Sequence, residues 1–223
     1  MRLEIAERLR CPRAHEPSPL VLVAQEVVER ELRRGVAGCP VCGAEARIVN
    51  GDVLFDADAA LDTPFASPAT EPQSAPEDRR AEREALDRLI ALLGLGEPEG
   101  TVLLTGRYVR FAAQISNETS VSIVISRPLA HAERDVSNAE VSAFTLAEPL
   151  VPFSDHTFRG AAVDSTAAAL LADAARTLVV GGRLLAPAEA TLPSSVRELA
   201  RDKAEWVAER EAGSGAVIPL RRA

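Results

Sequence analysis

All three cysteines of this 223-residue chain lie in two short clusters near its N-terminus. The first cluster combines Cys11 with His15, and the second is the run Cys39-Pro-Val-Cys42-Gly. Two such pairs of thiolate and imidazole ligands suit a tetrahedral Zn²⁺ ion, because each pair holds one side of the metal. The proline stiffens the second cluster, and the glycine lets backbone amides turn toward the sulfur atoms. We therefore predict a zinc site formed by Cys11, His15, Cys39 and Cys42.

Such a site would be structural. Four protein ligands leave no open position for a water molecule, so we predict no catalytic residue in it. The alternative is that the cysteines are buried, chemically idle thiols and that His15 is a surface side chain. An odd number of cysteines, grouped in pairs with metal-ligand spacing, also argues against a framework of disulfides.

The composition describes a globular chain with an uneven charge. Hydrophobic residues make up 47% of the sequence, and no apolar run is long enough to cross a bilayer. The N-terminus lacks the layout of a signal peptide, so we expect a cytoplasmic protein without membrane insertion. The net charge is −8, and residues 1–55 contain eight arginines and eight acidic residues, so the whole excess falls on residues 56–223. This acidity argues against a nucleic-acid partner.

Residues 1–55 are predicted to form a small zinc-ribbon domain. It would contain a strand at Leu20–Val23, a helix at Gln25–Arg34 and a hairpin at Arg47–Phe55. The pair Asn50-Gly51 between apolar flanks favours a two-residue hairpin turn.

Residues 56–76 are predicted to be a proline-rich linker. Proline recurs at every fourth position from 64 to 76, and such a pattern prevents both helix and strand pairing. The last residues, 216–223, form a tail of apolar and basic residues after a Gly-Ser-Gly run.

Residues 77–215 are predicted to form an α/β domain. It opens with an amphipathic helix at 77–95, in which leucines and an isoleucine form one stripe. Strands are predicted at 101–104, 121–125, 141–146, 160–163 and 183–186, and helices at 108–115, 166–178 and 194–211. Strands that alternate with helices predict a mostly parallel sheet with helices on both faces.

Two segments of this domain carry a family pattern. The loop Leu150–Arg159 and the Gly-Gly turn within Arg176–Leu185 resemble two motifs of the S-adenosylmethionine-dependent methyltransferases with a Rossmann-like sheet. Residues 1–55 are similar to the small zinc ribbons that activate such methyltransferases or are fused to them. The resemblance implies a Rossmann-like methyltransferase domain at 77–215, behind an N-terminal zinc ribbon.

The cofactor motifs of that family are altered in this chain. The loop after the first strand has one glycine, Gly106, where the family has a glycine-rich run. Ser126 and Arg127 replace the acidic residue that the family uses to bind ribose, Ala147 replaces the acidic residue near adenine, and Arg159 replaces an aspartate. The sequence therefore predicts no cofactor-binding residues and argues against S-adenosylmethionine as a ligand.

Three functions follow from these patterns. The first is a pseudo-methyltransferase, a non-catalytic structural or regulatory subunit with a protein partner or a homo-oligomeric state. The second is an active methyltransferase with a divergent pocket, in which Asp164 would act as base or positioning group. The third is a sheet that binds another ligand, such as a nucleotide, through Arg107 and Arg127.

Overall fold

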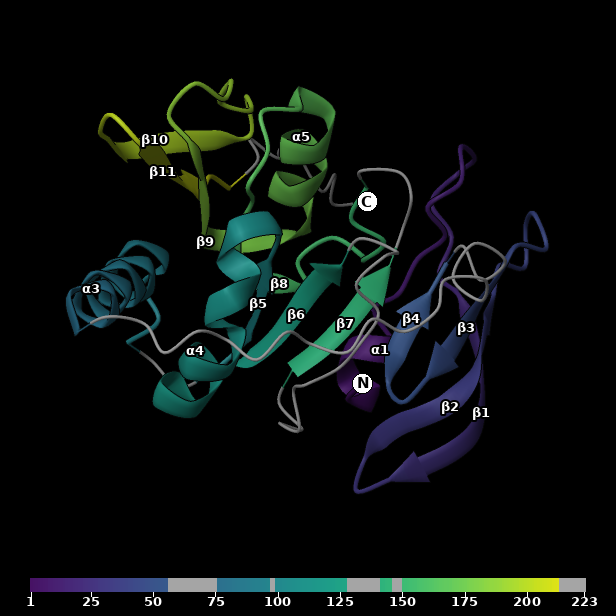
Figure 1. Ribbon diagram of the computed structural model, residues 1–223. Helices are drawn as coiled ribbons and strands as arrows, with labels where there is room; N and C mark the ends of the chain where they lie inside the picture. Colours follow the sequence, from purple (N-terminus) through teal and green to yellow (C-terminus); the bar gives the residue numbers. More distant parts are fainter. Residues whose placement is uncertain (56–75, 97–98, 128–140, 146–149, 213–223) are drawn as a thin grey trace, which may run out of the picture.

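The computed structural model describes residues 1–55, 76–96, 99–127, 141–145 and 150–212, and these residues form one eleven-stranded sheet (Figure 1). The strands are β1 (Val21–Val28), β2 (Glu31–Gly38), β3 (Glu45–Val49), β4 (Asp52–Leu54), β5 (Thr101–Leu104), β6 (Ser122–Arg127), β7 (Val141–Thr145), β8 (Phe158–Ala162), β9 (Leu178–Pro187), β10 (Val196–Arg201) and β11 (Glu205–Arg210). Their order across the sheet is β1-β2-β3-β4-β7-β6-β5-β8-β9-β11-β10.

The strands from β5 onward form a Rossmann-like, mostly parallel sheet. The run β7-β6-β5-β8-β9 is parallel, and β11 lies antiparallel between β9 and β10. Counted along the chain from β5, the order is 3-2-1-4-5-7-6, so the direction of winding reverses between β5 and β8. The predicted fold class is therefore confirmed.

Helices cover both faces of this sheet. Alternate residues of β5 point to opposite faces: Val102 and Leu104 contact one core, and Leu103 contacts the other. The helix α3 (Pro76–Leu93), the 3-10 helix η1 (Gly106–Phe111) and α4 (Ala112–Thr119) pack on the first face, and α1 (Leu3–Ala6) and α5 (Ala168–Thr177) pack on the second. Among the described residues, no helix combines the length and the apolar character that a membrane span requires.

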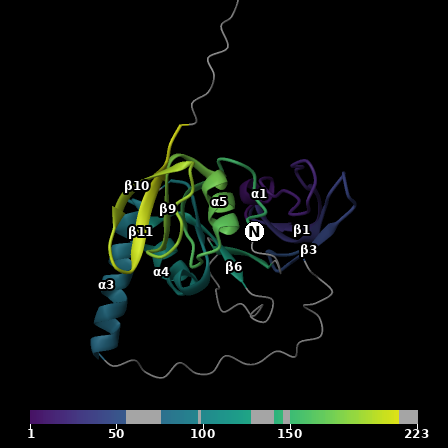
Figure 2. The same cartoon turned by 90° about the horizontal axis from the view of Figure 1, so that it is seen from above.

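The four N-terminal strands continue the same sheet. Antiparallel pairs join β1 to β2, β2 to β3 and β3 to β4, and β4 then lies parallel to β7. The predicted hairpin turn is present, with φ of 51° at Asn50 and 83° at Gly51. Figure 2 shows these strands and the β10–β11 hairpin at opposite ends of the molecule. The predicted linker, apart from the first residue of α3, and the predicted tail lie outside the described residues.

The helix predicted at Gln25–Arg34 is wrong, because this segment forms the end of β1, a tight turn and the start of β2. The turn is made by Glu29 and Arg30, whose φ values are 49° and 66°. Glutamate and arginine rarely adopt positive φ values. The sequence therefore did not indicate this turn in the way that an Asn-Gly pair would.

The helix predicted at 194–211 is also wrong, because the segment forms β10 and β11. The Asp202 carboxylate accepts hydrogen bonds from the backbone N–H groups of Ala204 and Glu205, at 2.8 and 2.9 Å, and so fixes the turn. Trp206 is fully buried on β11 and donates its indole N–H to the carbonyl of Ala190 at 2.9 Å.

The Gly181-Gly182 pair lies inside β9 and not at the reversal between helix and strand. The helix α5 ends at Thr177 and β9 begins at the next residue. Gly181 has φ of 78°, and a Cβ on Gly182 would lie 2.8 Å from the carbonyl oxygen of Val179. The close packing of the backbone within β9 therefore requires a glycine at position 182.

Candidate functional site

The structure brings the four predicted metal ligands together at one end of strands β1–β3, which with β4 make up the part of residues 1–55 called the ribbon below. Cys11 and His15 lie on the segment between α1 and β1, and Cys39 and Cys42 lie in the turn between β2 and β3. The three sulfur atoms and one imidazole nitrogen all lie within 4.8 Å of one another. Cys11 and Cys39 are buried, whereas Cys42 is exposed.

The spacing of these atoms fits a tetrahedral zinc ion. The Cys11 and Cys42 sulfur atoms are 3.7 Å apart, and the Cys39 sulfur lies 3.4 Å from His15 Nε2. A tetrahedron with Zn–S bonds of about 2.3 Å and Zn–N bonds of about 2.0 Å has S–S edges of about 3.8 Å and S–N edges of about 3.5 Å. The donor set and the two measured edges therefore match what this metal requires.

Backbone groups orient the ligands. His15 Nδ1 lies 2.6 Å from the carbonyl oxygen of Glu16, and a proton on that nitrogen leaves Nε2 to face the sulfur atoms. Burial raises the pKa of Cys39, but the backbone N–H groups of Cys42 and Val41 outweigh it and lower the value to about 6. Burial and the neighbouring thiols raise the pKa of Cys11 to about 11. One thiolate thus forms readily in this turn.

A second candidate region lies where the sheet changes its direction of winding. In open α/β sheets, ligands bind outside the carboxyl ends of the strands at this switch point. Here the loop after β5 carries Gly106 and Arg107, and the segment after β8 carries Asp164. The strands that end beside them lead into residues 128–140 and 146–149, which lie outside the described residues.

Asp164 is bound on several sides by the loop after β5. Its carboxylate accepts the backbone N–H of Arg107 at 3.0 Å and lies 3.6 Å from the Arg107 guanidinium. Its own N–H donates to the hydroxyl of Thr105 at 3.1 Å. A Cβ on Gly106 would lie 2.5 Å from the Cβ of Asp164, so the glycine allows this close approach.

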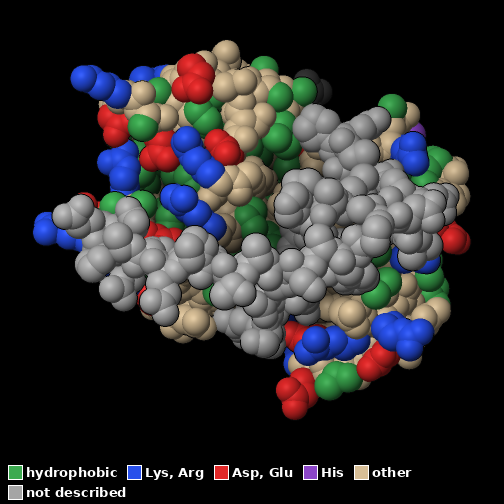
Figure 3. Space-filling model, in the orientation of Figure 1, with side chains coloured by type: hydrophobic (Ala, Val, Ile, Leu, Met, Phe, Trp, Pro, Cys, Tyr) green, Lys and Arg blue, Asp and Glu red, His purple; other side chains and the backbone are tan. Residues whose placement is uncertain are grey.

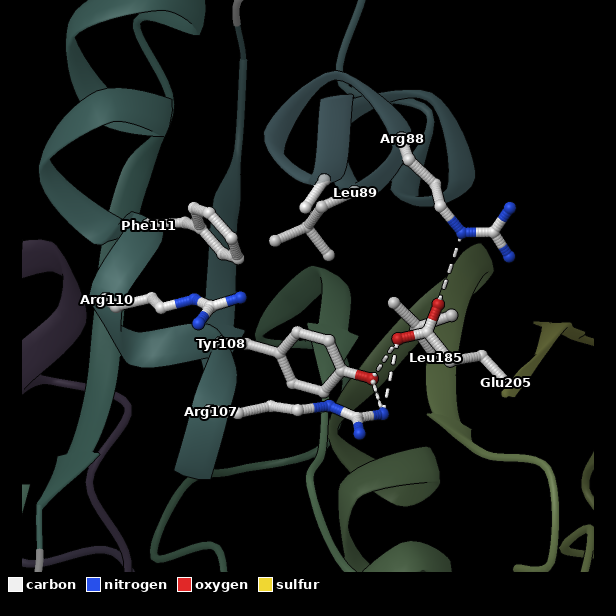
Figure 4. A pocket seen from close by; sticks show the side chains of 9 residues that line it. Arg88, Leu89, Arg107, Tyr108, Arg110, Phe111, Leu185 and Glu205 are labelled. Carbon is white, nitrogen blue, oxygen red and sulfur yellow. Dashed lines mark hydrogen bonds and ion pairs between the residues drawn. The ribbon is translucent and has the colours of Figure 1, made fainter. Parts of the chain in front are cut away.

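A polar network continues from Arg107 to the hairpin (Figure 4). The Tyr108 hydroxyl donates to Glu205 at 2.7 Å and accepts from Arg107 at 3.0 Å. Arg88 of α3 reaches the same Glu205 carboxylate at 3.4 Å. Burial raises the pKa of Tyr108 above its usual range, which keeps the phenol protonated. These groups line a cavity of about 80 Å³ with Leu89, Phe111 and Leu185.

The sequence reasoning did not identify Tyr108 and Glu205. Glu205 was placed in a predicted helix, and only the strand register of β11 against β9 brings it to this edge, opposite Pro187. Tyr108 is the chain's one tyrosine, which is the signal that could have drawn attention to it.

The positions that depart from the family pattern have different surroundings. Ser126 lies near the end of β6, in register with Phe144 of β7, and Ala147 lies outside the described residues. Arg159 donates to the carbonyl oxygens of Gly94 and Glu99, both at 3.0 Å, just beyond the C-terminus of α3. Arg159 therefore anchors the end of a helix, where a cation is favourable.

Comparisons with known proteins do not place the chain in a family. No family model matches the chain, and no curated protein sequence matches it. Solved structures that match include a geranyl diphosphate methyltransferase in complex with GPP and sinefungin, at 18% identity and a TM-score of 0.40, covering 50% of this chain and 46% of that one. A geranyl diphosphate C-methyltransferase from Streptomyces coelicolor A3(2), in complex with Mg²⁺, a thiolodiphosphate and S-adenosylhomocysteine, has 16% identity and a TM-score of 0.39, with coverages of 52% and 49%.

A third structure, geranyl diphosphate methyltransferase in complex with SAM, has 15% identity and a TM-score of 0.36, with coverages of 59% and 58%. This chain spans about half the length of the structures it matches. The likeness concerns the fold and does not assign a substrate or an activity.

These structures correct the prediction that argued against S-adenosylmethionine. Two of them are complexes with S-adenosylhomocysteine or SAM. The prediction against this cofactor is therefore withdrawn.

Proposed function

We propose that this methyltransferase-like chain is a non-catalytic subunit, structural or regulatory, of a larger protein assembly. The observation that supports the proposal is the bonding of Asp164, the candidate base at the switch point. A general base must reach the proton that it removes. The Asp164 carboxylate instead contacts the backbone and guanidinium of Arg107, within the protein's own loop.

The same proposal gives the ribbon a structural zinc ion. Cys11, His15, Cys39 and Cys42 would hold it and leave no position for a substrate or a water molecule. The ion would lock the two segments that flank β1 and β2 into one unit. Its chemistry would then serve the fold of this end of the sheet and not a reaction.

An active methyltransferase is the second candidate. The observation that favours it is the position of Asp164, whose side chain is 30% exposed beyond the carboxyl end of β8. Ligands of open α/β sheets bind at this edge. In this case Asp164 would turn from Arg107 toward a bound acceptor.

Methyl transfer separates the two candidates. The full chain is incubated with radiolabelled S-adenosylmethionine and with protein, RNA and small-molecule fractions of a cell extract, and calorimetry measures cofactor binding in parallel. We expect the wild type and Asp164→Asn to give the same background label, whether or not the cofactor binds. Asp155→Asn serves as a matched control, because Asp155 lies on another loop and its carboxylate pairs with Arg176 of α5.

Label transferred by the wild type and by Asp155→Asn, but lost in Asp164→Asn, would overturn the non-catalytic proposal. The assembly is tested separately by the size of the native protein in extracts of its source cells. Migration there as a lone 23.7-kDa chain would contradict a role as a subunit.

A further inference from the structure

The strand β1 forms one edge of the sheet and exposes apolar side chains. Val21 and Val23 are 57% and 59% exposed, whereas Leu22 between them packs against the core. Glu26 is the one charged residue in the eight-residue strand. In Figure 3 this end of the molecule, at the lower right, shows hydrophobic side chains beside charges of both signs. An apolar edge of this kind is a template for pairing with another strand.

The opposite edge of the sheet is built differently. Three of the six residues of β10 are charged, namely Arg197, Glu198 and Arg201. Arg201 and Glu198 pair at 2.8 Å, and Arg197 lies 3.4 Å from Glu209 of β11. Charged side chains on an edge strand are the usual protection against edge-to-edge association. This protection is present at β10 and is missing from the first half of β1.

The backbone of β1 defines which groups point outward. A Cβ on Gly35 would lie 2.6 Å from the carbonyl oxygen of Val23, so this carbonyl faces β2. Because successive backbone groups alternate, those of Leu22 and Ala24 point away from β2. The outward N–H of Leu20 donates to the carbonyl of Leu9 at 3.0 Å, so the edge is covered up to Leu20. Within the part of the chain that the structure describes, no strand pairs with this edge from Val21 onward.

We propose that this open edge pairs with the same edge of a second copy of the chain. The strands would run antiparallel about a two-fold axis at Val23, with Leu22 of each copy opposite Ala24 of the other. Both residues present outward backbone groups, so each opposition forms a pair of hydrogen bonds. The exposed Val23 side chains of the two copies would meet on the axis, a favourable pair of β-branched residues. The register shift after Ala24 ends the regular segment before Glu26.

Charge favours a second copy at this end. Residues 1–55 are neutral overall, with eight arginines and eight acidic residues, whereas the rest of the chain carries the net −8. Contact through this end would bring together two segments without net charge, so it would add little to the repulsion between two chains of net charge −8.

Two segments of the same chain, 56–75 and 213–223, fit this edge less well. The sequence 56–75 contains Pro64, Pro68 and Pro72, and a proline has no N–H to donate to a strand ladder. The last eleven residues, 213–223, extend at most about 40 Å. They follow β11, nine strand spacings from β1, which is about 43 Å along the sheet.

Sedimentation velocity of the full, zinc-loaded chain tests the proposal. The paired segment is short, so we expect weak dimerisation, with a dissociation constant on the order of 10 μM. The mass should move from 23.7 kDa toward twice that value as concentration rises. Added salt should strengthen the dimer, because it screens the repulsion between two chains of net charge −8.

Val23→Lys should keep the chain monomeric at every concentration, because two lysines would meet on the axis. Val49→Lys is the matched control: Val49 is 43% exposed on the same ribbon, but β3 has neighbours on both sides. Zinc content and circular dichroism confirm that each variant folds, and Val23→Thr, which keeps a β-branched residue, should weaken the dimer without abolishing it. Hydrogen exchange should show concentration-dependent protection of the Leu22 and Ala24 amides.

A wild-type chain that stays monomeric at concentrations well above about 10 μM would overturn the proposal. Equal dimerisation of Val23→Lys and the wild type, or equal loss in Val49→Lys, would place the contact elsewhere and also overturn it. The inference does not depend on whether the chain is catalytic, so these experiments test it independently of the proposed function.

Discussion

The two apolar cores on either side of the sheet hold different parts of the molecule together. The first core combines residues of the ribbon, such as Leu32 and Ile48, with residues of the later strands and α5, such as Phe144 and Leu171. The second core takes its members from residue 85 onward, between α3, α4 and the parallel strands. One core is therefore shared by both halves of the chain, whereas the other belongs to the Rossmann-like half.

This difference shows how the ribbon is attached. The strand contact between the halves is small, because β4 and β7 are in register over two residue pairs, Val53 with Phe144 and Leu54 with Thr145. The shared core is the larger contact, and the cluster of cysteines and histidine lies at one end of strands β1–β3. We infer that two things would hold residues 1–55 in place, a metal bound by this cluster and the shared core.

Loss of the metal should have the largest effect. Structural zinc in small domains contributes on the order of 10 kcal/mol to folding. Cys39→Ser, or treatment with a strong chelator, should therefore expose the amides of β1–β3 to hydrogen exchange and leave those of β5, β6 and β8 protected. Native mass spectrometry should show one zinc per wild-type chain and none in the variant.

The matched control for this variant is Val41→Ala, in the same turn. Val41 is 61% exposed, so its truncation should leave the zinc bound and the exchange pattern unchanged. A wild-type chain without zinc, or a Cys39→Ser chain with unchanged protection of the ribbon, would show that the metal is no anchor.

A cavity in the shared core should have the next largest effect. Phe153 is fully buried, with edge-to-face contacts to Phe144 and Phe158 at centroid distances of 5.6 and 5.1 Å. Its backbone also forms a bridge with Leu9 of the N-terminal segment. Phe153→Ala should lower the free energy of unfolding by about 3–5 kcal/mol and increase exchange in the ribbon and in α5 together.

Phe111→Ala is the variant to compare with Phe153→Ala, because Phe111 is almost equally buried but lies in the second core. Its loss should cost a similar free energy in urea unfolding, with exchange raised in α3 and α4 and not in the ribbon. Identical exchange patterns in the two variants would mean that the cores act as one unit.

The sequence predicted those parts of the fold whose local signals agree with their surroundings. Asn50-Gly51 adopts the positive φ values that this pair favours, and the leucine stripe of α3 packs on the sheet as its spacing indicates. The meeting of Cys11, His15, Cys39 and Cys42 in one cluster was also predictable, because cysteine is rare here and the spacing of the two pairs suits one coordination site.

The errors come from segments in which tertiary contacts override local preference. Residues 194–211 are rich in arginine and glutamate, which favour helices, but the segment pairs with β9 and buries Trp206 and Ala208. The valines of β1 favour a strand, but their spacing also suits a helix. Glu29-Arg30 is not a typical turn sequence, so the end of the strand was not recognised. The network of Tyr108 and Glu205 depends on that misjudged hairpin, so the sequence could not assemble it.

The smallest effect should come from the surface ion pair beside the shared core. Asp155 lies 2.5 Å from Arg176 of α5, and its side chain is 54% exposed. Burial raises the pKa of Asp155, but the hydrogen bond and charge of Arg176 outweigh it and hold the pKa below the usual 3.8. The ionised form is thus favoured in the folded state, and the pair stabilises the fold above pH of about 4, where the unfolded chain is also ionised. This contribution is lost as the pH falls through the lowered native pKa.

Asp155→Asn should therefore cost less than about 1 kcal/mol near neutral pH, because the pair is exposed to solvent. The difference from the wild type should shrink as urea unfolding is repeated at lower pH, below about 4. Asp87→Asn on α3 is the matched control, since Asp87 has a side chain 55% exposed and pairs with Arg83 on the helix over the second core. If Asp155 strengthens the shared core, its variant should increase exchange in α5, which Asp87→Asn should leave unchanged. Equal exchange in α5 for both variants would mean that the Asp155–Arg176 pair plays no part in attaching the ribbon, which would then depend on the metal and the apolar contacts alone.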